Sequence, residues 1–145
     1  MSFLFKKVCI ASDHAGFNLK ENIKNHLINK YVSIFDLGPY NNKSVDYPDF
    51  AKKLAKRIKT EKSDVGILVC GSGTGMAISA NKTKGIRAAV CYNLRSTRLS
   101  RQHNNANIIA LGARLTKKSL SLKLVEIFLK TRFESGRHLK RIKKI

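Results

Sequence analysis

The stretch from Val65 to Asn81, VGILVCGSGTGMAISAN, constrains this chain more than any other part of it. It starts with a continuous apolar run, which is typical of a strand buried on both faces of a parallel sheet. The glycines at alternate positions that follow let the backbone turn and approach a ligand closely, because no Cβ is in the way. Residues 76–81 then have the pattern of a helix. The stretch therefore predicts a strand, a glycine turn and a helix in direct succession.

The glycine turn predicts a seat for a small anion. Unpaired amides at the start of a helix, together with the positive end of its dipole, attract negative charge or charge that develops in a reaction. Cys70 stands at the edge of this seat, and Ser72 lies within the turn. A thiol beside such amides can serve as a base or as a nucleophile.

Two familiar phosphate motifs do not fit this turn. The dinucleotide fingerprint needs a glycine where Met76 stands and an acidic residue about 20 positions later. The chain has no Asp or Glu between Asp64 and Glu126. The nucleotide P-loop needs a lysine directly after its last glycine, and none follows these glycines at that spacing.

The rest of the chain alternates strands and helices. Strands are predicted at 7–12, 32–37, 65–69, 86–91 and 108–111, and helices at 17–29, from 48 onward, 76–81, 94–103 and 116–130. Asp46 is predicted to cap the helix that begins at Pro48. In the last helix, the core face is predicted to include Ile127. This alternation predicts an α/β fold, a three-layer, doubly wound (Rossmann-like) five-stranded parallel sheet in a single domain over 1–145.

In doubly wound folds, ligands bind beyond the carboxyl ends of the strands, where the strand order reverses. Asp13 and His14 follow the first predicted strand, and Cys70 follows the third. If these strands are neighbours, one pocket receives both sets of side chains.

The formal net charge of +20 raises the alternative of a non-enzymatic module that binds RNA or another anion. A nucleic-acid binder should show stacking aromatics in a basic groove, whereas these aromatics lie mostly in core-like patterns. The lysines are instead scattered over predicted helix faces that we expect to be solvated (Lys20, Lys24, Lys52, Lys53, Lys56, Lys59). We therefore expect no specific nucleic-acid partner, although the charge would attract anionic substrates.

Other sequence features indicate a cytoplasmic protein that does not bind membranes. No apolar run approaches the ~20 residues that cross a bilayer, and the N-terminus lacks the features of a signal peptide. Cys9, Cys70 and Cys91 cannot all be paired with one another, and their spacing matches no zinc motif. We predict reduced thiols, of which Cys9 and Cys91 pack inertly in the core.

Several short motifs, in order along nearly the whole chain, resemble the ribose-5-phosphate isomerase B family. They are Asp13-His14, Asp46-Tyr47-Pro48, Cys70-Gly71-Ser72-Gly73-Thr74-Gly75, Ala80-Asn81-Lys82, Gly85-Ile86-Arg87-Ala88, Ser100-Arg101-Gln102-His103-Asn104, Gly112-Ala113-Arg114 and Gly136-Arg137-His138. The resemblance implies an isomerase that interconverts ribose 5-phosphate and ribulose 5-phosphate in the non-oxidative pentose phosphate pathway. It also implies a homodimer, or a higher oligomer, that works without a metal or cofactor.

The resemblance carries site roles onto this chain. It implies that Cys70 is the base, that His103 helps to open the sugar ring, and that Arg137 and Arg141 hold the phosphate. Ser72 and Asp13 are further catalytic candidates. The candidate substrate contacts are His14, Tyr47, Gly71, Gly73, Thr74, Gly75, Asn104 and Arg114. The family builds its active sites from both chains of a dimer, so the basic tail at about 131–145 is expected to reach the partner subunit.

Two departures from the family pattern concern the glycine turn. Ser72 stands where the family often has threonine. Serine keeps the hydroxyl group of threonine and lacks only its methyl group. Met76 stands where one branch of the family has a glutamate base, so this chain is expected to use cysteine. Sister enzymes that act on allose 6-phosphate or galactose 6-phosphate share many of these motifs, and a hexose phosphate therefore stays an alternative substrate.

The residues support the same chemistry without the family name. Aldose-to-ketose isomerisation needs a base, a seat for an oxyanion and a handle on the phosphate. Arg137 and Arg141 are four residues apart, so a helical tail would place both on one side. Hydrolysis, with Cys70 as nucleophile and His103 as its activator, is a further alternative.

His26 lies in a predicted helix without a polar companion and is expected to have no role.

Overall fold

The computed structural model describes residues 2–61 and 64–145. Five strands form one parallel sheet: β1 (Lys7–Ser12), β2 (Ser33–Asp36), β3 (Val65–Cys70), β4 (Ala88–Val90) and β5 (Ile108–Gly112). Their order in the sheet is β2-β1-β3-β5-β4, so the winding direction reverses between β1 and β3. The predicted doubly wound α/β fold is therefore confirmed.

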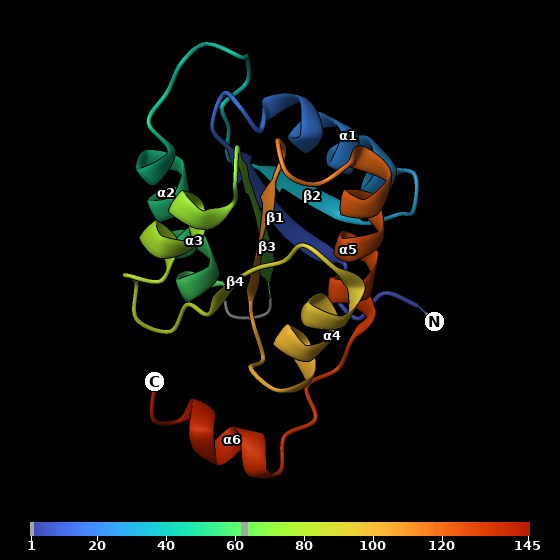
Figure 1. The fold of residues 1–145 in the computed structure, drawn as a ribbon, viewed down its shortest axis with the longest axis vertical. Helices are drawn as coiled ribbons and strands as arrows, with labels where there is room; N and C mark the ends of the chain where they lie inside the picture. Colours follow the sequence, from blue (N-terminus) through green and yellow to red (C-terminus); the bar gives the residue numbers. More distant parts are fainter. Residues whose placement is uncertain (1, 62–63) are drawn as a thin grey trace.

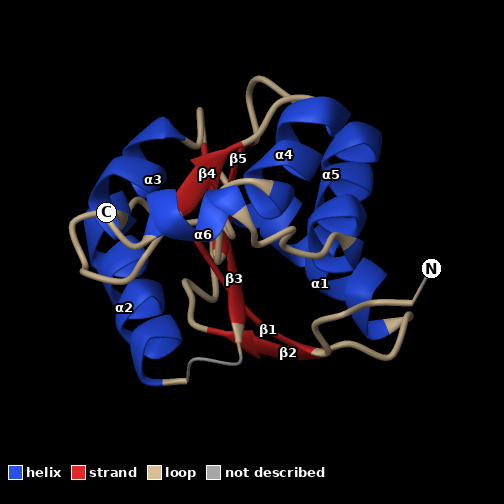
Figure 2. Cartoon of the chain, turned by 90° about the horizontal axis from the view of Figure 1, so that it is seen from below, coloured by secondary structure: helices blue, strands red, loops and turns tan. Residues whose placement is uncertain are grey.

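Helices cover both faces of the sheet. They are α1 (Phe17–Ile28), α2 (Tyr47–Thr60), α3 (Thr74–Ala80), α4 (Leu94–Gln102), α5 (Lys118–Lys130) and α6 (Arg137–Ile142). Figure 2 shows α2 and α3 on one face and α1, α4 and α5 on the other. The short helix α6 lies below the ends at which the strands begin (Figure 1). Across the described ranges, every helix is too short or too polar to cross a membrane.

The strand β3 lies at the centre of the core and is buried along its whole length. Its side chains alternate between two apolar clusters because successive residues of a strand point to opposite faces. Ile67 and Val69 pack toward α1 and α5. Leu68 and Cys70 pack toward α2 and α3. The apolar run thus predicted correctly a strand buried on both faces.

Several element boundaries differ from the prediction. The helix α3 begins at Thr74, so Met76 lies inside it and is fully buried. The strand β4 spans only Ala88–Val90. Asp46 occupies the N-cap position of α2, but its side chain makes no capping hydrogen bond, so the predicted cap is wrong. Ile127 is only half-buried, because the buried face of α5 runs instead through Val125 and Leu129.

The prediction of a solvated Lys20 is wrong. Its side chain has 0% exposed surface, and its ammonium bonds to the Asp36 carboxylate at the end of β2. Lys24 is partly buried beside the same carboxylate. The lysines predicted on α2 are exposed as expected: Lys52, Lys53, Lys56 and Lys59. The sequence could not separate the two groups, since periodicity does not show where a helix meets an acidic side chain.

His26 also has a polar partner that the sequence did not reveal. Its Nε2 lies 2.7 Å from Glu126 Oε1 on α5, and Lys130 Nζ lies 2.9 Å from Glu126 Oε2. Desolvation alone would raise the pKa of Glu126, but the hydrogen bonds from Lys130 and His26 outweigh it and lower that pKa to about 2. The contact between His26 and Glu126 joins α1 to α5.

Candidate active site

A pocket of about 540 Å³ opens where the strand order reverses, beyond the carboxyl ends of β1 and β3. Its lining residues are Asp13, Tyr47, Cys70, Gly71, Ser72, Thr74, Gly75, Ile78, Arg114 and Leu115. Because β1 and β3 are neighbours, side chains that follow the two strands meet in one pocket, as predicted.

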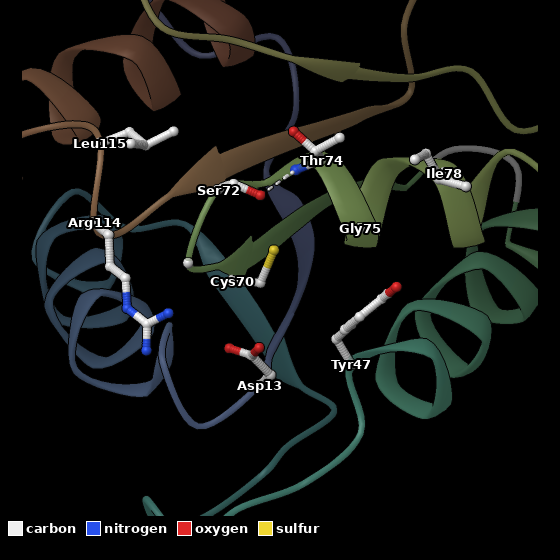
Figure 3. Close-up of a pocket in the computed structure, with 10 residues that line it drawn as sticks. Asp13, Tyr47, Cys70, Ser72, Thr74, Gly75, Ile78, Arg114 and Leu115 are labelled. Atoms are coloured by element: carbon white, nitrogen blue, oxygen red, sulfur yellow. Dashed lines mark hydrogen bonds between the residues drawn. The ribbon is translucent and has the colours of Figure 1, made fainter.

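The Cys70 sulfur lies at the centre of this pocket, between Arg114 and Tyr47 (Figure 3). Cys70 is only 4% exposed, and its sulfur accepts a hydrogen bond of 3.1 Å from the Gly73 amide. This bond holds the sulfur at the edge of the apolar cluster, where Cys70 lines the pocket. The Asp13 carboxylate is held nearby, since its Oδ1 accepts a bond of 3.0 Å from the Gly16 amide. A thiol and a carboxylate therefore face the same small space.

The glycine turn holds its shape through backbone geometry. Gly73 has φ +80°, a region that favours glycine, and a Cβ there would lie 3.0 Å from the Leu111 backbone. The next amide, that of Thr74, donates to Ser72 Oγ at 3.2 Å. From the segment after β4, the Tyr92 hydroxyl donates to the Ser72 carbonyl at 2.9 Å. The amides of this turn are thus directed to the thiol and to the Ser72 hydroxyl.

Tyr47 and Arg114 form opposite walls of the pocket (Figure 3). The Tyr47 ring packs against α3 at Gly75, where a Cβ would lie 2.8 Å from ring carbons. The Arg114 amide donates to the Gly71 carbonyl at 3.0 Å, which continues the pairing of β3 with β5 past the end of the strands. This pairing brings the guanidinium over Gly71, and it supplies the pocket with a positive group.

Other predicted site residues do not line this pocket: His14, Gly73, His103, Asn104, Arg137 and Arg141. The His14 ring is exposed, and its Nδ1 accepts a hydrogen bond of 3.2 Å from the Val45 amide. Arg137 and Arg141 both lie on the short helix α6, so the condition for placing both on one side, a helical tail, is met. However, α6 lies at the end of the sheet opposite to the pocket (Figure 1).

At that far end, His103 stacks on His138, with ring centroids 4.2 Å apart and an interplanar angle of 12°. Glu134 Oε2 lies 3.7 Å from His138 Nε2 and 4.0 Å from His103 Nε2. Desolvation, followed by electrostatic interactions with His103 and Arg137, lowers the pKa of His138. These three groups lie within 4.8 Å of one another, close enough to be considered as metal ligands. However, an imidazole binds a metal close to its ring plane, and two stacked rings inclined by only 12° do not both aim at one ion beside them, so the arrangement does not fit chelation by both histidines.

Sequence reasoning missed three residues of the site. Ile78 lies one helical turn after Thr74, and Leu115 directly follows Arg114, so both could have been found from neighbours already chosen. Tyr92 had no such signal, because its bond to Ser72 depends on how β4 is placed in the sheet.

A sequence profile of the family described as Ribose/Galactose Isomerase matches residues 8–145. The chain belongs to this family. Among its relatives, the ribose-5-phosphate isomerase B of Escherichia coli is 41% identical over 140 residues, which cover 97% of this chain and 94% of the relative. The resemblance noted in the motifs is thus confirmed over almost the full length of both proteins.

Solved structures of ribose/galactose isomerases have the same fold. The ribose 5-phosphate isomerase of Thermotoga maritima is 51% identical and superposes with a TM-score of 0.93, covering 95% of each chain. The ribose-5-phosphate isomerase B of Mycoplasma genitalium, solved with bound ribulose-5-phosphate, is 44% identical with a TM-score of 0.92. That match covers 99% of this chain and 95% of the other.

Proposed function

We propose that this ribose/galactose isomerase interconverts ribose 5-phosphate and ribulose 5-phosphate. The observation that carries the proposal is the Cys70 thiol, which a backbone amide directs into a pocket that also holds a carboxylate and a guanidinium. The relative that binds ribulose-5-phosphate supports the choice of a pentose phosphate. We place this reaction in the non-oxidative pentose phosphate pathway.

In the proposed reaction, the Cys70 thiolate removes the proton on C2 of the open-chain aldose. The electron pair of that C–H bond forms the C1–C2 double bond, and O1 takes up negative charge as an enediolate. Return of the proton to C1, with transfer of the O2 proton to O1, gives the ketose, in which C2 carries the carbonyl. The Ser72 hydroxyl stabilises the oxyanion, and Asp13 orients a sugar hydroxyl.

We further propose that a second copy of the chain completes each site. One chain places Cys70 and its α6 arginines at opposite ends of the sheet, so they cannot act on one sugar within that chain (Figure 1). The apolar rim of the pocket supports an interface there, since Ile78 is 59% and Leu115 is 63% exposed. In the resulting homodimer, the partner's tail brings Arg137 and Arg141 to the phosphate, and its His103 and Asn104 to the sugar ring.

The cytoplasm is the proposed location of this homodimer. The three cysteines Cys9, Cys70 and Cys91 are all free thiols. Reduced thiols are what a reducing compartment maintains.

Parallel assays with ribose 5-phosphate, allose 6-phosphate and galactose 6-phosphate test the proposed function. A pentose and a hexose phosphate differ by one carbon between the reacting end and the phosphate. The wrong length would leave charge-assisted hydrogen bonds unmade, so kcat/KM for ribose 5-phosphate should exceed the other two values by ~100-fold or more. A faster hexose phosphate would overturn the substrate assignment. Turnover of none of the three would overturn the isomerase, and would favour the anion-binding alternative.

A further inference from the structure

The buried ammonium of Lys20 is the centre of a polar unit close to the pocket. It donates to both Asp36 oxygens, at 2.8 and 2.7 Å, and to the Pro39 carbonyl at 2.8 Å. The side chain has no exposed surface. A charged group without water needs such partners to stay charged, so ammonium, carboxylate and carbonyl hold one another in place.

This unit fixes the start of segment 37–46, which connects β2 to α2. Asp36 Oδ1 also accepts a bond of 2.9 Å from the Gly38 amide. The Gly38 carbonyl in turn accepts a bond of 3.1 Å from the amide of Ser12, the residue before Asp13. The beginning of the segment is therefore bonded both to Lys20, through Asp36 and Pro39, and to the end of β1, through Gly38.

The far end of segment 37–46 is bonded to His14, the residue after Asp13 at the edge of the pocket. The Val45 amide donates to His14 Nδ1 at 3.2 Å, and Tyr47, two residues later, begins α2 and lines the pocket. Segment 37–46 is thus held at both ends by residues next to Asp13. The position of Tyr47 relative to Cys70 depends on this path.

Lys24 provides a natural comparison on the same helix. Its ammonium lies 2.6 Å from Asp36 Oδ2, and its side chain is 21% exposed. Both ammonium groups also contact Glu21, whereas Lys20 alone of the two donates to the Pro39 carbonyl. Desolvation alone would raise the pKa of Asp36, but the bonds from Lys20, Lys24 and the Gly38 amide outweigh it and lower that pKa. Both lysines stabilise the carboxylate, but Lys20 alone of the two is bonded to the segment itself.

We infer that Lys20 is a positioning residue, which holds segment 37–46 and with it Tyr47 against the substrate pocket. This inference rests on the proposed function for its kinetic consequence. Its structural part, the attachment of the segment, does not.

The test compares the full-length variants Lys20→Met and Lys24→Met, because methionine has a similar length without the charge. Amide hydrogen exchange is followed at Ser12, Gly38 and Val45, and steady-state kinetics are measured with ribose 5-phosphate. In Lys20→Met we expect faster exchange at these amides with β3 and β5 unchanged, and a KM raised by ~10-fold or more with a smaller change in kcat. Lys24→Met should stay close to the wild type in both measurements.

The inference would be overturned by any of three results. They are unchanged amide exchange in Lys20→Met, a normal KM despite faster exchange, and equal effects in Lys20→Met and Lys24→Met. If the wild type turns over none of the sugar phosphates, the proposed function fails, while hydrogen exchange still decides whether Lys20 holds the segment. Should Lys20→Met not fold, Asp36→Asn removes the negative partner of the same unit and is expected to give the same local pattern of exchange.

Discussion

At the scale of single residues, specific hydrogen-bond partners place the polar groups of this chain, from three to a hundred residues away in sequence. Cys70 receives the Gly73 amide, Lys20 lies on the Asp36 carboxylate, and His26 meets Glu126 on another helix. The groups that contact each side chain therefore determine its orientation and its hydrogen bonding. Two predictions at this scale concern Cys70 and Glu126.

Replacement of Cys70 by alanine should abolish proton transfer and leave phosphate binding largely intact. The thiolate acts on a carbon-bound proton in the transition state and contributes little to affinity in the ground state. We expect kcat/KM to fall by about 10²- to 10⁴-fold, the range for loss of a positioned base. Steady-state kinetics and a separate binding titration measure the two effects.

Cys91→Ala is the matched control for Cys70→Ala. Cys91 is also buried, but desolvation raises the pKa of its thiol and it lies outside the pocket lining. This variant should retain kcat. Near-normal turnover in Cys70→Ala would remove that thiol from the mechanism.

The Glu126 ion pair predicts a specific loss of stability in acid. The pKa of Glu126 is about 2 in the folded chain, below its usual value of 4.5, so the unfolded chain binds this proton more readily. The pair therefore stabilises the fold above about pH 4.5, and its contribution is lost as the pH falls toward 2. Glu126→Gln should be less stable than the wild type at pH 7 and should show a shallower loss over that window.

Urea unfolding at a series of pH values measures this difference. Glu61→Gln, at the exposed C-terminal end of α2, serves as the control and should follow the wild-type profile. If Glu126→Gln retains the full acid dependence, the carboxyl group does not have the depressed pKa.

At the scale of elements, the junction between β3 and α3 is the part of the fold that the site depends on most. Gly73 turns the chain directly after the strand, and its amide reaches back to the Cys70 sulfur. Two separate features call for glycine there, the positive φ and the close Leu111 backbone. A comparison with a second glycine separates them.

Gly73→Ala and Gly85→Ala should differ in stability by the cost of one steric contact. Both glycines have positive φ, +80° and +89°, and each alanine should cost about 1 to 2 kcal/mol for that reason. A Cβ at Gly85 meets no atom within 4 Å, whereas at Gly73 it would lie 3.0 Å from the Leu111 backbone. Gly73→Ala should therefore lower the free energy of unfolding further, as measured by urea denaturation, and should also impair catalysis.

Equal losses of stability in the two variants would show that the Leu111 contact relaxes without cost. Full activity of Gly73→Ala would show that the catalytic sulfur does not need this turn.

At the scale of the whole molecule, the candidate site is divided between two ends of the sheet. Asp13 follows β1 and Cys70 ends β3, while His103 and the α6 arginines lie beyond the ends at which the strands begin (Figure 1). The stacking of His103 on His138 ties α6 to the end of α4. This division predicts that two copies must act together.

Mixing two inactive chains should restore activity. One chain carries Cys70→Ala, and the other carries Arg137→Ala with Arg141→Ala. If the tail serves the partner's pocket, each mixed dimer has one complete site, so random exchange of equal amounts should give about a quarter of the wild-type activity. Each variant assayed alone provides the baseline.

Lys140→Ala with Lys143→Ala is the matched control, since it removes the same charge from the same tail and should stay active without mixing. Absence of any recovery after demonstrated subunit exchange, or a fully active monomer in sedimentation, would contradict the shared site.

The sequence by itself determined the sheet and the half of the site that surrounds Cys70. The apolar run before Cys70, the glycines after it and the alternation of strands and helices are local patterns, and local patterns decide strand, turn and helix. The carboxyl ends of neighbouring parallel strands then brought Asp13 and Cys70 together. The motifs also identified the family, because their order extends along the chain.

Only the tertiary structure decided the contacts between residues far apart in sequence. It buried Lys20 on Asp36, paired His26 with Glu126, brought Tyr92 to the Ser72 carbonyl and left His103 and α6 at the far end from the pocket. Such contacts depend on which helix covers which strand and on the direction of each side chain across the packed layers. The spacing of residues along the chain shows neither which helix covers which strand nor where a side chain points. A periodic pattern could therefore place Lys20 on a helix, but it could not show which face of that helix met a carboxylate.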